Sequence, residues 1–207
     1  MGGQRQTLLD DHVDALAAAL GPFRRSAPLL ARWGTALAWT VGQGGRLLVA
    51  GNGGSAAEAQ HLAAELVGKL RDDRPALSAI ALHAETSSLT AIANDYGYAE
   101  VFARQVRAHG RPDDVLLLIS SSGRSANLLA AAAAAAELGM RRWAFTGPAP
   151  NPLASACDEA LTVPSTDGQV VQELHLVAAH VLCEQVEVAL PTVLGLIRSY
   201  SEARVVP

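Results

Sequence analysis

The chain has 207 residues, of which 50% are hydrophobic and 17% are charged. This balance is typical of a folded domain with a large core, and it excludes a disordered or fibrous protein. With 20 acidic and 16 basic residues the formal net charge is −4, and only 4% of the residues are aromatic. The chain therefore lacks the basic face and the stacking platforms that nucleic acids require, and we expect no nucleic-acid partner.

Cysteine content and the start of the chain indicate the compartment. Cys157 and Cys183 are the only cysteines, too few for a disulfide scaffold and unsuited to a metal-binding pair. Residues 1–6 contain no apolar signal region. No apolar run approaches the roughly eighteen residues of a membrane helix. We expect a cytoplasmic protein that does not bind membranes.

Two helices are predicted before the first strand. Apolar residues recur at helical spacing over residues 7–20 and 26–41, and a glycine-rich stretch at 42–45 ends the pattern. Short apolar runs then appear at 46–50, 79–82, 115–119, 143–146 and 160–163. None of these runs alternates polar with apolar residues, which indicates parallel strands buried on both faces.

Helical segments separate these strands. They are expected at 56–70, 87–94, 99–108, 126–138 and 169–189, and we expect Pro191 to interrupt the last one before a further helix at 192–201. Alternating strands and helices predict an α/β fold, an open parallel sheet with right-handed crossovers. We assign residues 1–45 to the N-terminal helices and 46–207 to the α/β domain, within one structural unit.

The first candidate binding loop follows the first strand, because open α/β sheets bind ligands at the carboxyl ends of their strands. Residues 51–55, Gly-Asn-Gly-Gly-Ser, lead directly into a helix whose N-terminus attracts anions. A dinucleotide site is a competing interpretation. However, Ala56 replaces the third glycine of that pattern, and no acidic residue ends the second strand. We expect no nucleotide cofactor, and a simple tight turn remains the alternative.

The second candidate loop follows the third strand. Ser120, Ser121, Ser122 and Ser125 surround Gly123 and open a helix, an arrangement that suits a phosphate monoester. No lysine follows the glycine, so the loop is not a nucleotide P-loop. A helix cap in a polar loop is the alternative.

Two helices carry candidate acid/base or metal-binding residues. His61 and Glu65 are four residues apart and share one helix face. This spacing suits two metal ligands, or a carboxylate base beside an imidazole, but also an ordinary surface hydrogen bond. His180 lies in an apolar stretch of the last long helix, where a hydrogen-bonded core histidine is the simpler interpretation.

Longer motifs resemble the bacterial phosphoheptose isomerases of the sugar isomerase (SIS) domain superfamily. They occupy residues 51–57, 60–66, 90–98, 120–125, 164–167 and 172–180, and the similarity continues to about residue 188. The resemblance implies a flavodoxin-like fold with N-terminal helices that pack on the core and on neighbouring subunits. It also implies a homotetramer with active sites between subunits.

The resemblance further implies conversion of D-sedoheptulose 7-phosphate into D-glycero-D-manno-heptose 7-phosphate. In this chain Ser55 and the four serines of the second loop would hold the phosphate. The sugar would contact Asn52, Gly53, Gly54, Glu65, Asn94, Asp95 and Gln172. Arg124 departs from the asparagine usual in the family, and its role stays open.

The resemblance assigns Glu65 and His180 to catalysis, and His61, Glu65, Gln172 and His180 to a zinc ion. Isomerisation moves a proton between adjacent carbons through an enediol, which needs a carboxylate and a second acid/base group. Glu65 and His180 suit these two roles in either order. A zinc ion would polarise the carbonyl.

Two other functions remain as alternatives. One is a non-catalytic SIS-domain protein, either a phosphosugar-binding module or an adaptor for a replication initiator. Such adaptors lack equivalents of Glu65 and His180, so the presence of both favours an enzyme. The other is an isomerase for a different phosphosugar, which the loops do not exclude.

Overall fold

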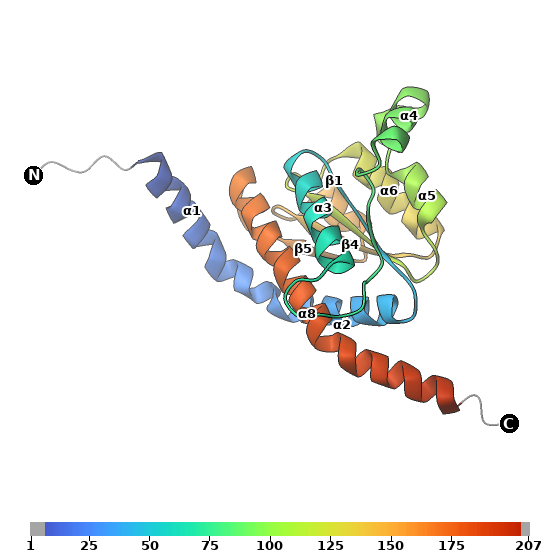
Figure 1. Cartoon of the computed structure of the whole chain (residues 1–207). Helices are drawn as coiled ribbons and strands as arrows, with labels where there is room; N and C mark the ends of the chain where they lie inside the picture. Colours follow the sequence, from blue (N-terminus) through green and yellow to red (C-terminus); the bar gives the residue numbers. More distant parts are fainter. Residues whose placement is uncertain (1–6, 204–207) are drawn as a thin grey trace, which may run out of the picture.

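The computed structural model describes residues 7–203, with side chains to residue 200; the sequence interpretation of residues 1–6 lies outside this range. Two helices precede the sheet, and helices then alternate with strands (Figure 1). In chain order the helices and strands are α1 (Leu8–Phe23), α2 (Ala27–Gly42), β1 (Leu47–Gly51), α3 (Gly54–Val67), β2 (Ala79–Ala81), α4 (Thr86–Tyr96), α5 (Ala103–His109), β3 (Val115–Ser120), α6 (Ala126–Glu137), β4 (Arg141–Thr146), α7 (Pro152–Ala156), β5 (Glu159–Thr162) and α8 (Gly168–Ala203). Short 3-10 turns, η1 (Arg24–Ser26) and η2 (Tyr98–Glu100), complete the order.

The sheet confirms the predicted α/β class. Its five strands are all parallel and lie in the order β2-β1-β3-β4-β5. After β1 the chain adds β2 on one side of the sheet, and it then adds β3, β4 and β5 in turn on the other side. The direction of strand addition therefore reverses between the neighbours β1 and β3. This is the flavodoxin-like order, and its switch point is where such sheets bind ligands.

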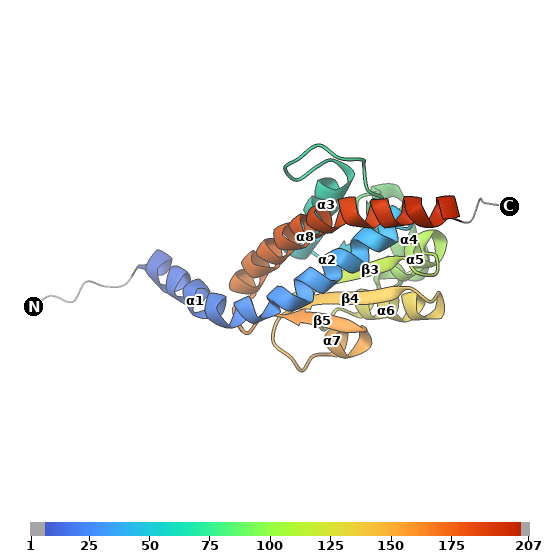
Figure 2. The same ribbon diagram turned by 90° about the horizontal axis from the view of Figure 1, so that it is seen from below.

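Helices cover both faces of the sheet. Leu47 and Val49 of β1 contribute to one core with α2, α3 and α8, whereas Leu48 and Ala50 contribute to the other with α5, α6 and α7. Figure 2 shows α2 and α8 side by side on one side of the sheet. Burial on both faces explains why the strands are continuously apolar.

The expected break at Pro191 is wrong. Helix α8 continues through this proline to Ala203, although its axis changes direction along its length (Figure 1). A proline inside a helix removes one N–H donor and bends the axis. Here Leu190 and Val193 are both buried in the core beside α2, so packing on either side of the proline maintains the helix. The short helix α7 and the turn η2 were not predicted.

By length and composition alone, α8 could also cross a membrane over Gly168–Tyr200, the single such helix in the described residues. The expectation based on apolar runs overlooked this helix because charged and polar residues interrupt its sequence. Its N-terminal half makes polar contacts with α3 through His175 and His180 and with α1 through Glu173. These contacts are those of a helix packed within a protein.

Candidate functional site

The two predicted binding loops meet at the switch point of the sheet. Gly51, at the end of β1, pairs with Ile119 near the end of β3, so both loops leave the same edge. Gly53 and Ser125 occupy the N-cap positions of α3 and α6, and neither helix has a side-chain capping bond. The first N–H groups of both helices are therefore directed to the loops, where an anion can accept from them.

A side-chain bridge joins these loops. Asn52 donates to Asn127 Oδ1 at 3.0 Å, and Asn127 donates back to Asn52 Oδ1 at 2.9 Å. Tyr98 from η2 donates to the same Asn52 oxygen at 3.1 Å. The sequence analysis missed Asn127 and Tyr98, although an asparagine in the first turn of a helix rich in alanine was a signal for Asn127.

The serine loop is shaped by its own hydroxyl groups and a glycine. Ser120 accepts from the Gly123 N–H at 3.1 Å, and Ser122 accepts from the Arg124 N–H at 3.3 Å. Gly123 has φ +62°, and a side chain there would collide with Asn151, so the turn requires glycine. Ser55 of the other loop is buried, whereas Arg124 is exposed.

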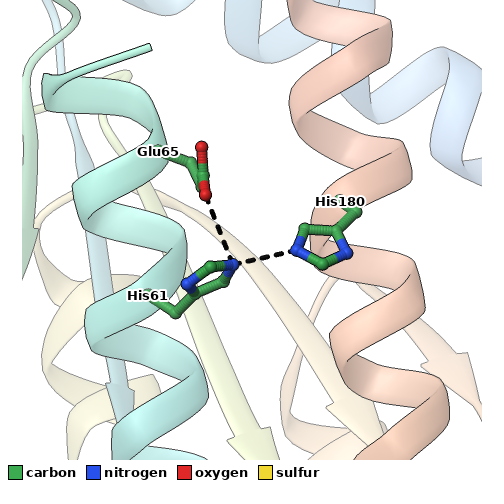
Figure 3. A group of neighbouring side chains, drawn as sticks. All are labelled: His61, Glu65 and His180. Carbon is green, nitrogen blue, oxygen red and sulfur yellow. Dashed lines mark hydrogen bonds and ion pairs between the residues drawn. The ribbon is translucent and has the colours of Figure 1, made fainter. Parts of the chain in front are cut away.

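The remaining candidates lie along the contact between α3 and α8. His61 and Glu65 project from α3 toward His180 of α8 (Figure 3). The Nε2 atoms of His61 and His180 are 2.9 Å apart, and His61 Nε2 lies 3.4 Å from Glu65 Oε1. All three residues are partly exposed, so the group is accessible to a ligand.

The donor geometry fits a metal ion. One nitrogen or oxygen from each of His61, Glu65 and His180 lies within 4.8 Å of the others. Two ligands at tetrahedral zinc stand about 3.3 Å apart when each bond is about 2.0–2.1 Å, close to the observed separations. Gln172 is two turns before His180 and lies against Gly54, where a Cβ would be only 2.6 Å from Gln172 Oε1.

A second histidine–carboxylate pair lies between these two contacts. Glu58 Oε2 is 3.8 Å from Nδ1 of His175, whose side chain is fully buried. Burial raises the pKa of Glu58 to about 7 and lowers the pKa of His175 to about 4. Both groups are therefore held neutral near pH 6, and the pair is a buried polar contact between helices rather than an exposed acid/base. The sequence analysis did not single out this pair.

Two predicted sugar-binding residues lie just before Tyr98, the residue that donates to Asn52 of the first loop. Asn94 and Asp95 are exposed at the end of α4, where the Asn94 amide donates to Asp95 at 2.8 Å. A surface hollow lined by Trp39, Asp113 and Arg141 lies at the opposite edge of the sheet, near the amino ends of β3 and β4. The residues suited to phosphate binding and acid/base chemistry lie elsewhere, in the two loops at the carboxyl edge of the sheet and on α3 and α8. We therefore assign the candidate active site to these two loops and helices.

A five-stranded parallel sheet in this order, covered by helices on both faces and preceded by two helices, agrees with the architecture of SIS domains, a class of sugar isomerase domains. In agreement, the family model described as SIS domain matches residues 13–147. The phosphoheptose isomerase of Streptomyces coelicolor is 64% identical over 179 residues, which are 86% of this chain and 78% of that protein.

Solved structures show the same similarity. A phosphoheptose isomerase from Francisella tularensis superposes with a TM-score of 0.80 at 34% identity, covering 87% of this chain and 98% of that one. The enzyme from Neisseria gonorrhoeae gives 0.79 at 38% identity, with 86% and 96% covered. The chain belongs to the phosphoheptose isomerase family.

Proposed function

We propose that the protein interconverts D-sedoheptulose 7-phosphate and D-glycero-D-manno-heptose 7-phosphate. The observation that carries this proposal is the group formed by His61, Glu65 and His180, a carboxylate and two imidazoles in mutual contact. It occurs in a chain whose relatives are named phosphoheptose isomerases. Carboxylate and imidazole are the groups that proton transfer between adjacent carbons and oxygens requires.

The two loops bind the phosphate end of the substrate. Hydroxyl groups from the serine loop and Ser55, with the N–H groups at the starts of α3 and α6, surround the phosphate oxygens. Residues expected to contact the sugar are Asn52, Gly53, Gly54, Glu65, Asn94, Asp95 and Gln172. The acid/base group lies farther along α3, which suits a seven-carbon substrate whose phosphate and reacting carbons are at opposite ends.

Glu65 and His180 perform the proton transfers. Glu65 removes the proton from C1 of the ketose as the C1–C2 enediol forms, and it returns that proton to C2. His180 delivers a proton to the C2 oxygen and withdraws one from the C1 hydroxyl, which becomes the aldehyde. In each half of the reaction the sugar loses one proton and gains one, so its overall composition is unchanged. No redox cofactor is needed.

His61, Glu65 and His180 would hold the zinc ion, and the resemblance adds Gln172, which in this chain lies two turns before His180 and against Gly54. When bound, zinc would polarise the substrate carbonyl and so acidify the neighbouring C–H. His61 keeps both imidazoles and the carboxylate in contact, since its Nε2 atom faces His180 and Glu65. A carboxylate that binds the metal through one oxygen retains the other for proton transfer.

We further propose a cytoplasmic homotetramer with active sites between subunits. Large apolar side chains are exposed on α1 and α8, among them Leu8, Leu9, Val13 and Val188. Figure 1 shows α1 and the C-terminal part of α8 extending beyond the sheet, where a second subunit can reach them. In this arrangement the N-terminal helices α1 and α2 pack on neighbouring subunits as well as on the core.

A turnover assay tests the proposed reaction. The protein, both as purified and after zinc addition, is incubated with sedoheptulose 7-phosphate in heavy water and followed by NMR. We expect an aldose product with deuterium from solvent at the carbon that receives the proton. Binding of the phosphosugar with neither product nor exchange would contradict the proposal and favour a binding module; turnover of a different phosphosugar would change the substrate.

A further inference from the structure

Asn127 is a buried polar residue with no role in the proton transfers. Its side chain, only 4% exposed, lies in the first turn of α6 beside Leu128 of the core. A buried amide is costly unless its donor and acceptor groups are paired. Both groups of Asn127 are paired, and the partner for both is the single side chain of Asn52.

This pairing constrains the glycine-rich loop. Asn52 precedes Gly53, whose φ of +55° is accessible mainly to glycine. The Asn52 amide would otherwise rotate freely at the mouth of the site. Its two bonds to Asn127 and the bond from Tyr98 fix its plane and direct its remaining N–H away from Asn127.

The pairing also connects the two binding loops. Asn52 belongs to the β1–α3 loop, and Asn127 follows the β3–α6 loop by two residues. The strands β1 and β3 pair as far as Gly51 and Ile119, so no sheet hydrogen bond holds the loops beyond that point. The amide pair extends the connection past the end of the sheet.

We propose that Asn127 is a positioning residue, which aligns Asn52 and holds the glycine-rich loop against the serine loop. The inference rests on the proposed function, because it assigns Asn52 to the sugar. A preorganised amide does not have to be ordered when substrate binds. Loss of the pair therefore weakens recognition of the sugar most. Phosphate binding is affected much less, because the serine loop, which supplies most of the phosphate-binding hydroxyl groups, is shaped by its own hydrogen bonds to Gly123 and Arg124.

A double-mutant cycle tests this role. Asn127→Ala and Asn52→Ala are each expected to lower kcat/KM for the phosphosugar at least about tenfold, mainly through KM, as for one lost hydrogen-bonded pair. Because Asn127 acts through Asn52, the double variant should be no worse than Asn52→Ala alone. Inorganic phosphate should bind Asn127→Ala with less than about a threefold change. The proposal would be overturned if the losses of kcat/KM in the two single variants multiplied in the double variant. An unchanged KM in Asn127→Ala would overturn it as well.

Two further measurements separate positioning from simple stabilisation. Gln105 of α5 is a similarly buried amide, 5% exposed, that donates to the Val101 carbonyl just before its own helix. Gln105→Ala should lower the melting temperature without changing KM. In NMR spectra of the unliganded wild type, the Asn52 side-chain amide should be protected from exchange, and Asn127→Ala should abolish that protection. This readout needs no turnover, so an inactive wild type would refute the reaction, while an unprotected Asn52 amide would refute the positioning role.

Discussion

Glu65 is the residue on which the proposed chemistry depends most directly. Glu65→Gln retains the size and hydrogen-bonding capacity of the side chain but cannot accept the carbon proton. We expect kcat to fall by about 10²–10⁴-fold, while the dissociation constant for the phosphosugar changes by less than about threefold. Steady-state kinetics and calorimetry measure the two effects. Glu137→Gln, an exposed carboxylate of α6, is the control, and full activity in Glu65→Gln would exclude this residue as the base.

The serine loop has a different expected signature. Replacing both Ser120 and Ser122 with alanine removes two hydroxyl groups proposed to bind a charged phosphate. Hydrogen bonds to charged groups contribute about 1.5–3 kcal/mol each, so the affinity for the phosphosugar should fall at least about tenfold, measured by calorimetry. Ser155→Ala, at an exposed position of α7, is the control. Unchanged affinity would mean that the phosphate binds elsewhere.

At the scale of secondary structure, the contact between α3 and α8 organises the acid/base group. Gly54 meets Gln172, Glu58 meets His175, and His61 meets His180. These contacts advance together along both helices, so the helices run parallel in a fixed alignment. A shift of one helix along the other would separate all three contacts at once.

The burial of Glu58 beside His175 predicts a pH-dependent stability. The pKa of Glu58 is raised from 4.5 to about 7 by burial, so between these values the folded state binds more protons than the unfolded state. Its contribution to stability therefore falls as pH rises through this window. Glu58→Gln removes the ionisation, and at pH 8 we expect it to raise the free energy of unfolding by on the order of 1–3 kcal/mol.

Thermal unfolding at pH 4 and pH 8 checks this prediction. The gain of Glu58→Gln over the wild type should be present at pH 8 and absent at pH 4. Glu137→Gln should show no such difference, because that carboxylate is 63% exposed. A destabilised Glu58→Gln at pH 8 would show that the buried carboxylate is favourably charged in the native protein.

Zinc should bind across the same two helices. We expect one ion per chain, and a melting temperature that rises with zinc concentration because the ion binds the folded state preferentially. His61→Ala and His180→Ala should each lower zinc affinity at least about tenfold, as measured by calorimetry, whereas the exposed His109→Ala should not. Equal zinc affinity in all four proteins would place the ion outside this group.

Much of the architecture could be predicted because it depends on local patterns. Apolar runs between helical segments indicated the parallel strands, and small residues after β1 and β3 indicated the binding loops. The His61–His180 contact could not be predicted from spacing, since the residues are 119 positions apart and meet only through packing of α3 on α8. Pro191 was wrongly predicted to break α8 because propensity ignores the stabilising contacts of Leu190 and Val193 with the core.

At the scale of the whole molecule, the exposed apolar side chains predict assembly. Leu8, Leu9 and Val13 of α1 and Val188 of α8 are all more than half exposed, and several exposed large apolar side chains are typical of a protein–protein contact. Val188→Asp should shift the protein from tetramer to smaller species in analytical ultracentrifugation. It should also lower kcat/KM at least about tenfold while leaving the circular dichroism spectrum intact.

Ala136→Glu provides the matched control, because this exposed residue lies on α6, away from the apolar surface of α1 and α8. It should change neither sedimentation nor activity. A wild-type monomer with full activity would contradict both the tetramer and the location of the sites between subunits.

The alignment of α3 with α8 has a consequence for synthesis of the chain. The ribosome completes α3 early, but the partners of Gly54, Glu58 and His61 all lie on α8, which is made about a hundred residues later. A nascent chain that ends before α8 exposes the part of the core that this helix shares with α2 and α3, since α8 is still missing. The newly made protein therefore brings His61, Glu65 and His180 together only when α8 leaves the ribosome.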